Sequence, residues 1–113
     1  MSIEQTDTID AMFLSEDGTY VVLVAVDPLD WHEEVEAHIA LLRDKLNYYL
    51  DYVVSGRLAR EHPQLCDVPV AIWVMHHHAV IPRAENLYFQ AKEVLGRQGI
   101  ALVCERFVPE EDI

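Results

Sequence analysis

Apolar residues in this chain repeat with two different periods, and each period predicts one kind of element. Four short runs rich in β-branched and aromatic residues indicate strands, at residues 9–14, 20–26, 68–75 and 100–107. The second run reads YVVLVAV, which is typical of a strand covered on both faces. Turn residues from Ser15 to Gly18 separate the first two runs, so we expect these two strands to form a hairpin.

Two longer segments carry apolar residues at steps of three and four, which is the period of a helix. The first helix is expected to begin at Asp30, because Glu33 follows at the spacing of a capping box, and to end at Gly56. Its buried stripe is expected to consist of Val35, Ile39, Leu42, Leu46, Tyr49, Leu50 and Val53. The second helix is expected to open at Pro82 and to be closed by Gly96 and Gly99.

The predicted order of elements is β-β-α-β-α-β, which indicates an α/β (α+β) fold. We expect a two-layer sandwich: a mixed four-stranded sheet with the N-terminal hairpin at one edge, covered by two helices, of which the first is long. Right-handed connections between parallel strands place both helices on the same face. The central strands are apolar on both faces, so the other face also needs a cover. Either two copies of the chain pair through it, which we favour, or the strand order differs and the helices flank the sheet.

The composition is that of a globular chain. With 113 residues, 51% of them hydrophobic and 25% charged, the chain is long enough for a core and too apolar for disorder. No apolar run approaches the roughly 18 residues of a membrane span, and the start lacks the basic and apolar regions of a secretory signal. Two cysteines are too few for a disulfide framework. We therefore expect one domain over residues 1–113, located in the cytoplasm, with a flexible acidic tail at residues 109–113.

Charge is distributed very unevenly along the chain. Residues 1–42 include ten carboxylates and no Lys or Arg, and the first base is Arg43. This part of the chain supplies almost all of the net charge of -12. Such a field repels nucleic acid and anionic membranes, and it attracts basic proteins over about a Debye length, ~8 Å at physiological salt. The charge therefore favours a basic protein as the partner, without indicating a reaction.

A distinctive set of residues lies just before and along the first predicted helix: Leu29-Asp30-Trp31, His38-Ile39, Leu41-Leu42, Lys45-Leu46-Asn47, Tyr49-Leu50 and Ser55-Gly56. These residues resemble the pattern of a family of small acidic bacterial proteins that is known only as a domain of unknown function. The likeness extends from the turn at residues 17–18 to residues 99–100, and its most specific part is the stretch 29–56. The resemblance implies no activity, cofactor or catalytic residue.

Motifs for nucleotide and hydrolase chemistry are missing from the sequence. All four glycines serve predicted turns or helix ends, so none is left for a phosphate-binding loop, and no G-x-S-x-G, H-E-x-x-H or C-x-x-C motif occurs. The sharpest local signal is the triplet His76-His77-His78 at the end of the third predicted strand. There His76 and His78 would share a face, near Asp27 and Asp30 at the carboxyl ends of the parallel strands. Two imidazoles and a carboxylate would suit Zn²⁺ or another divalent metal.

Several other chemically capable residues are better interpreted as part of the core. His38 lies on or beside the buried stripe of the first helix, where a histidine with satisfied hydrogen bonds is the simpler interpretation. Trp31 and Trp73 are expected to pack against neighbouring elements. Cys66 and Cys104 have no base nearby in the sequence, so we expect inert thiols.

These observations leave three functional hypotheses, in order of preference. The first is a non-catalytic module without a cofactor that binds a basic protein, in the manner of immunity and antitoxin proteins that neutralise basic toxins. Its partner surface is expected to consist of Glu16, Asp17, Asp27, Asp30, Glu33, Glu34 and Glu36. The second is a small metal-dependent enzyme or metal-binding protein that uses His76 and His78 with Asp27 or Asp30. The third is a structural homodimer without a dedicated site.

Overall fold

The computed structural model describes residues 2–107 and contains every strand and helix that the sequence predicts. The elements, in chain order, are β1 (Ala11–Leu14), β2 (Val21–Asp27), α1 (Val35–Val54), α2 (Arg57–Glu61), the 3-10 turn η1 (Pro63–Leu65), β3 (Val70–His76), α3 (Pro82–Arg97) and β4 (Ala101–Arg106). The sequence pattern did not predict the short α2 and η1, which fill the connection between α1 and β3. The acidic tail expected at residues 109–113 lies outside the described residues.

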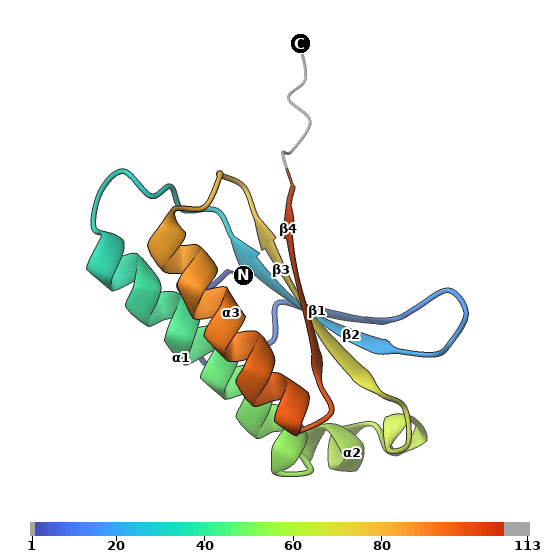
Figure 1. The fold of residues 1–113 in the computed structure, drawn as a ribbon. Coiled ribbons are helices and arrows are strands. Elements are labelled where there is room, and N and C mark those ends of the chain that lie inside the picture. The colour runs from blue at the N-terminus through green and yellow to red at the C-terminus, as the bar shows by residue number, and fades with distance from the viewer. Residues whose placement is uncertain (1, 108–113) are drawn as a thin grey trace.

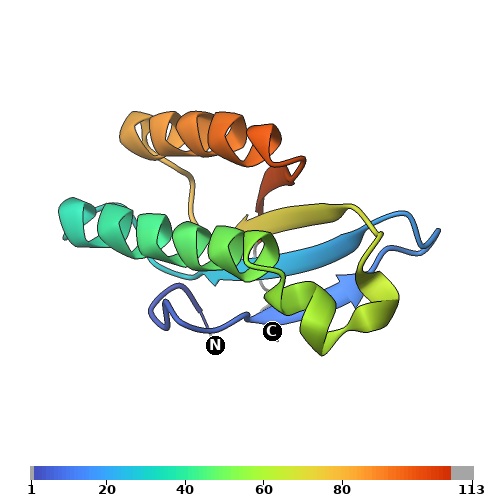
Figure 2. The same cartoon turned by 90° about the horizontal axis from the view of Figure 1, so that it is seen from below.

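The four strands are arranged in the order β1-β2-β3-β4. β1 pairs antiparallel with β2 through the hairpin, with Leu14 opposite Val21. β2, β3 and β4 run parallel, with Asp27 opposite His76 and His76 opposite Arg106. Both long helices lie on one face of the sheet (Figures 1 and 2). The predicted two-layer fold and strand order are therefore confirmed, and the alternative with helices on both faces is wrong.

The core lies between the two long helices and the face of the sheet that they cover. Alternate residues of β2 and β3 point into it, and Leu23 and Ile72 are fully buried there. The stripe predicted along α1 faces this core. His38, Lys45 and Tyr52 of α1 are also buried, although none of the three belongs to the predicted apolar stripe.

The start of α1 differs from the prediction. The carboxylate of Asp30 accepts a hydrogen bond from the backbone N–H of His32 at 3.1 Å, in a turn that precedes the helix. The residue that caps α1 is Glu34, which makes no side-chain hydrogen bond to the helix, and the first helical residue is Val35. The capping box predicted from Asp30 and Glu33 is therefore wrong. The helix has 20 residues and is about 30 Å long, shorter than expected.

Glycines follow both long helices. Gly56 comes after α1 with a φ of 85°, as predicted. Of the two glycines predicted after α3, Gly96 lies inside the helix, which continues to Arg97, and Gly99, with a φ of 73°, provides the turn into β4. Within residues 2–107, no helix combines the length and the apolar character that a membrane crossing requires.

A buried ion pair fixes the N-terminal segment against α1. Lys45 is fully buried, and its ammonium group donates to the carboxylate of Asp10 at 2.7 Å. It also donates to the backbone oxygens of Gln5 and Thr8, each at 2.6 Å. The second carboxylate oxygen of Asp10 accepts a hydrogen bond from the backbone N–H of Val26 at 2.9 Å. One helix, one strand and the N-terminal segment thus meet at a single charged pair.

The opposite face of the sheet carries no helix of the described chain (Figure 2), and we call it the uncovered face. The strand residues that alternate onto it are Ala11, Phe13, Val22, Val24, Val26, Ala71, Trp73, Met75, Ala101, Val103 and Glu105. The rings of Phe13 and Trp73 meet edge to face there, with centroids 6.1 Å apart. The sequence correctly predicted that one apolar face would remain without a helix.

Candidate functional site

A buried aspartate–histidine pair holds the connection from β2 to α1. Asp27 is fully buried, and its carboxylate oxygens lie 2.7 and 2.8 Å from Nε2 of His38. Nδ1 of the same ring lies 3.1 Å from the backbone oxygen of Asp30, and the indole of Trp31 stacks on the ring at a centroid distance of 3.5 Å. The backbone oxygen of Asp30 can only accept, so Nδ1 donates to it, and the carboxyl group of Asp27 and Nε2 share a second hydrogen bond. The prediction that His38 is a core histidine is confirmed.

An acidic hollow of about 290 Å³ lies beside this pair, between the loop that precedes α1 and the first turns of the helix. It is lined by Glu4, Leu29, Asp30, Glu33, Glu34, Ala37, His38 and Leu41. All four acids among these residues are exposed, and within residues 2–107 none of them forms an ion pair with a Lys or Arg. The hollow therefore combines four unneutralised carboxylates with apolar side chains, and we call it the acidic hollow.

The backbone at Glu34 brings two of these acids to the hollow. Glu34 has a φ of 53° and a ψ of 43°, and among residues 2–107 it is the one non-glycine residue with a positive φ. This left-handed conformation costs roughly 1 kcal/mol for a residue with a Cβ atom. It turns the chain into α1, where the carbonyl of Glu34 accepts the hydrogen bond of the His38 N–H at 3.0 Å. As a result Glu33 and Glu34, which are adjacent in sequence, both line the acidic hollow.

The structure divides the seven acids that were predicted to form one partner surface. Asp30, Glu33 and Glu34 gather at the acidic hollow, as one part of that surface. Asp27 does not belong to any surface, because its carboxylate is fully buried and bonded to a ring nitrogen of α1. Its inclusion among the partner-binding residues is wrong. Asp27 is the last residue of β2 and lies on the same face as Leu23 and Ala25, so its carboxylate points toward α1.

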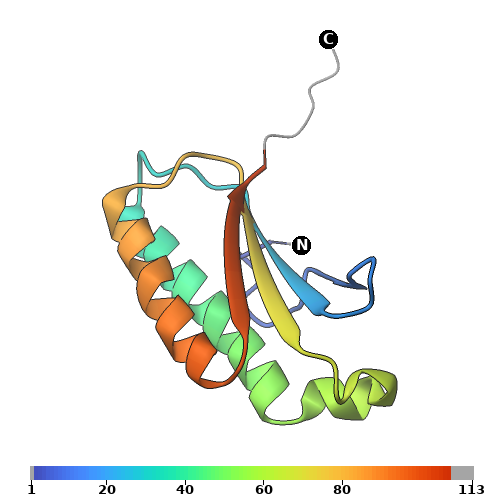
Figure 3. The ribbon, with the colours of Figure 1, turned by 45° about the vertical axis from the view of Figure 1, so that its right-hand side comes forward.

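The remaining three predicted acids lie away from the acidic hollow. Glu36 pairs with Arg83 of α3, where Nη2 lies 3.1 Å from Oε2, and the hydrogen bonds and charge of this guanidinium lower the pKa of Glu36. Glu16 and Asp17 are in the hairpin turn, and Figures 1 and 3 show this turn and the start of α1 on opposite sides of the molecule. Hydrogen bonds from Thr19 and from a neighbouring serine lower the pKa of Asp17, which thus stabilises the turn.

Comparison with known proteins identifies the family. The model of a family of unknown function, DUF6572, matches residues 1–107. The chain belongs to DUF6572. This match confirms the resemblance noted in the sequence, and it spans all the residues that line the acidic hollow. No curated protein and no solved structure gives a significant match to the chain.

The histidine triplet of this DUF6572 chain does not bring the proposed metal ligands together. His76 is buried at the end of β3, and its Nδ1 lies 2.8 Å from the backbone oxygen of His78, whose side chain is exposed. Asp27, which is opposite His76 in the sheet, is bonded to a histidine of α1 instead. Among residues 2–107, no group of three or more His, Cys, Asp or Glu side chains is arranged to hold a metal ion. This part of the DUF6572 chain therefore offers no ligand set for the metal hypothesis.

Sequence reasoning missed Glu4 as a residue of the acidic hollow. Ile3, its neighbour, is fully buried, and the backbone N–H of Ile3 donates to the carbonyl of Val26 at 2.9 Å. These contacts hold the N-terminal segment beside α1 and bring Glu4 to the hollow. A single isoleucine in a polar stretch was the available signal, and it is too short to predict an element.

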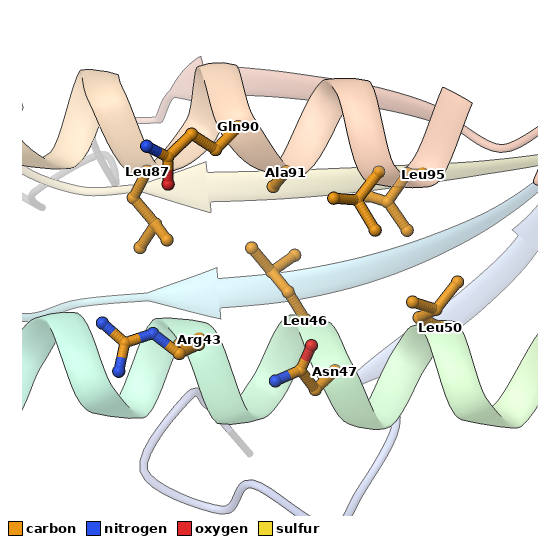
Figure 4. A pocket seen from close by; sticks show the side chains of 9 residues that line it. Arg43, Leu46, Asn47, Leu50, Leu87, Gln90, Ala91 and Leu95 are labelled. Carbon is orange, nitrogen blue, oxygen red and sulfur yellow. The ribbon is translucent and has the colours of Figure 1, made fainter. Parts of the chain in front are cut away.

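A second cavity, of about 230 Å³, lies between α1 and α3 of the DUF6572 fold. Figure 4 shows Leu46 and Leu50 of α1 on one side of it and Leu87 and Leu95 of α3 on the other. Arg43, Asn47, Gln90, Ala91 and Val94 complete the lining. The lining contains no acid, histidine or cysteine, so this groove offers no group for acid–base, nucleophilic or metal chemistry. The acidic hollow is therefore the candidate site.

Proposed function

We propose that this chain is a non-catalytic cytoplasmic module that binds a basic protein, and that the acidic hollow receives a basic side chain of that partner. One observation carries the proposal: four exposed, unneutralised carboxylates surround apolar side chains in one hollow. A lysine or arginine side chain has the matching two parts, an aliphatic stem and a cationic head. The apolar residues of the hollow would contact the stem and the carboxylates the head.

The charge of the chain supports this choice of partner. All four acids of the hollow lie within residues 1–42, the part of the chain that contains no base. Their field is therefore not cancelled by neighbours in sequence, and it would accelerate the encounter with a basic protein. Because these carboxylates are exposed, the attraction is expected to weaken with increasing salt.

The position of the hollow on rigid elements also supports binding. Below it, the buried pair of Asp27 and His38 fixes the loop to α1, with oxygen–nitrogen distances of 2.7 and 2.8 Å. The hollow is thus largely formed before any partner arrives, so little conformational entropy is lost on binding.

The experiment is capture of partners from the native cell lysate on the immobilised chain, at low and at high salt, read by mass spectrometry. A double variant, Glu33→Lys with Glu34→Lys, is expected to lose the captured protein. The control is Glu16→Lys with Asp17→Asn, which raises the charge of the hairpin turn, on the other side of the molecule, by three units against four for the hollow variant, and should retain capture. Capture that resists high salt, or that is lost equally in both variants, would contradict a role for the acidic hollow.

A further inference from the structure

The uncovered face is made of three rows of side chains that run across the strands. The strand registers place Phe13, Val22, Ala71 and Ala101 in the first row, Ala11, Val24, Trp73 and Val103 in the second, and Val26, Met75 and Glu105 in the third. Glu105, at the end of β4, is the one charged residue in these rows. Side-chain size is distributed differently in the first two rows: the first decreases from Phe13 on β1 to alanines on β3 and β4, whereas the second has its largest residue, Trp73, on β3.

Aromatic side chains at the margins extend this apolar surface. Phe13 is 44% exposed on β1, Tyr20 is 43% exposed beside the start of β2, and Phe107 is 47% exposed after the end of β4. At the centre of the face, Val22, Val24 and Ala71 are already buried in the single chain, at 4–6% exposure, so the accessible apolar surface is made by the larger and peripheral side chains around them. Exposed apolar side chains gathered on one face of a protein commonly mark an interface.

We propose that a second copy of the chain covers this face, related to the first by a two-fold axis that runs parallel to the strands between β2 and β3. Rotation about this axis places β1 of each copy over β4 of the other, and β2 over β3. The two sheets then pack face to face with their strands nearly aligned, as in a β-sandwich. The contact is isologous, because both copies use the same surface.

The two registers make this arrangement complementary in shape. Facing positions pair a large residue with a smaller one: Phe13 with Ala101, Val103 with Ala11, and the half-buried Trp73 with Val24. Val22 faces Ala71, and because both are already buried in the single chain, this pair adds little contact. In the third row Val26 faces Met75. Interdigitation of large and small side chains is what close packing of two layers requires. An axis across the strands through the second row would instead stack Trp73 on Trp73.

The charges of the chain agree with a second copy as the occupant. Each copy has a net charge of -12, so repulsion between like charges disfavours association of two copies through their acidic surfaces and favours a surface almost free of carboxylates. The uncovered face is such a surface, and a basic partner would find only Glu105 to bind there. In the proposed dimer, β4 of one copy lies over β1 of the other. Because β1 begins at Ala11, in the second row, no β1 residue of the other copy faces Glu105 in the third row. The carboxylate of Glu105 therefore stays at the solvent margin of the dimer. The acidic hollow lies at α1, on the other side of the sheet, so this inference is independent of the proposed function.

Charge pairs at positions 11 and 103 test both the dimer and its axis. Ala11 is exposed and Val103 is half-buried in the single chain, so the monomer should tolerate Ala11→Lys and Val103→Glu. Each single variant buries an unpaired charge in the interface and is expected to weaken the dimer by about 100-fold or more. Both changes in one chain should restore it, because position 11 faces position 103 of the other copy. Within one chain these positions lie on the two edge strands, so they cannot pair with each other.

The measurement is the molar mass by light scattering after size-exclusion chromatography at physiological salt, with circular dichroism to show that each variant is folded. The wild-type protein is expected at twice the mass of a single chain. Phe89→Lys, at a 64% exposed apolar residue of α3, is the control and should leave the dimer intact. A wild-type monomer at submillimolar concentration would overturn the proposal. So would a double variant that is more dissociated than either single variant, since that result places 11 over 11 and 103 over 103.

Discussion

The buried ion pair between Lys45 and Asp10 makes a specific prediction about stability. Changing Lys45 to Met keeps the aliphatic part of the side chain and removes the ammonium group. Asp10, whose side chain is 2% exposed, then keeps its charge in the interior, with the backbone N–H of Val26 as its remaining hydrogen-bond donor. The backbone oxygens of Gln5 and Thr8 lose their donor as well.

The expected loss is about 3–5 kcal/mol of the free energy of unfolding, which is the cost of removing one partner of a buried ion pair. Changing Asp10 to Asn in the same chain removes the stranded charge and keeps an oxygen that can accept from the Val26 N–H. The double variant Asp10→Asn/Lys45→Met is therefore expected to be more stable than Lys45→Met alone, by about 2 kcal/mol. A second substitution that restores stability is the signature of a buried charge rather than of lost packing.

Urea unfolding at a fixed protein concentration, followed by circular dichroism, measures the free energies of the wild type, the two single variants and the double variant. Arg43→Met is the matched control, because Arg43 is exposed on the same helix, and it should change the free energy of unfolding by less than about 0.5 kcal/mol. The reasoning is refuted if the two single effects add in the double variant, or if Lys45→Met costs no more than Arg43→Met.

Two further predictions concern single side chains of the core. The hydroxyl of Tyr88 is buried without a hydrogen-bond partner in residues 2–107, so Tyr88→Phe should keep the free energy of unfolding or raise it by about 1 kcal/mol. Tyr49→Phe loses two hydrogen bonds and should lower the free energy of unfolding by about 1–3 kcal/mol in the same urea assay. Burial raises the pKa of the Cys104 thiol from its ordinary 9.0 to about 11, so iodoacetamide at about pH 8 should label the exposed Cys66 and spare Cys104 until urea is added, as read by mass spectrometry. Equal labelling of both thiols in the native protein would show that Cys104 is not protected. The folded state holds the Cys104 proton more tightly than the unfolded chain does, so this thiol should also make the free energy of unfolding fall as the pH rises from about 9 to about 11.

The regular elements were predictable because their signals are local. The β-branched run at residues 20–26 and the three- and four-residue spacing along α1 each depend on neighbours in the sequence. The strand order then followed from short connections and the right hand of crossovers. The same reasoning predicted an uncovered apolar face, because the third strand is apolar at both alternating positions.

The individual polar residues were not predictable, because their roles depend on distant parts of the chain. Asp27 and Asp30 look equivalent in sequence, yet one is buried by His38, 11 residues further on, and the other stays exposed. Lys45, inside an apolar stripe, signals a buried base, but its carboxylate partner lies 35 residues earlier and nothing local identifies it. The capping box failed for a related reason: the spacing fits, but the Asp30 carboxylate is used in the preceding turn.

The separation of Asp10 from Lys45 also constrains the order in which the chain folds. The hairpin joins residues that are close in sequence and can form early, whereas this ion pair closes a loop of 35 residues and needs α1 to be in place. Before that step, the side chains of residues 1–42 repel one another, because they include ten carboxylates and no Lys or Arg. Lys45 is the second base of the chain, and docking of α1 brings it to the N-terminal segment. The absence of bases in this stretch therefore favours late closure of the N-terminus, after the helix that neutralises Asp10 has formed.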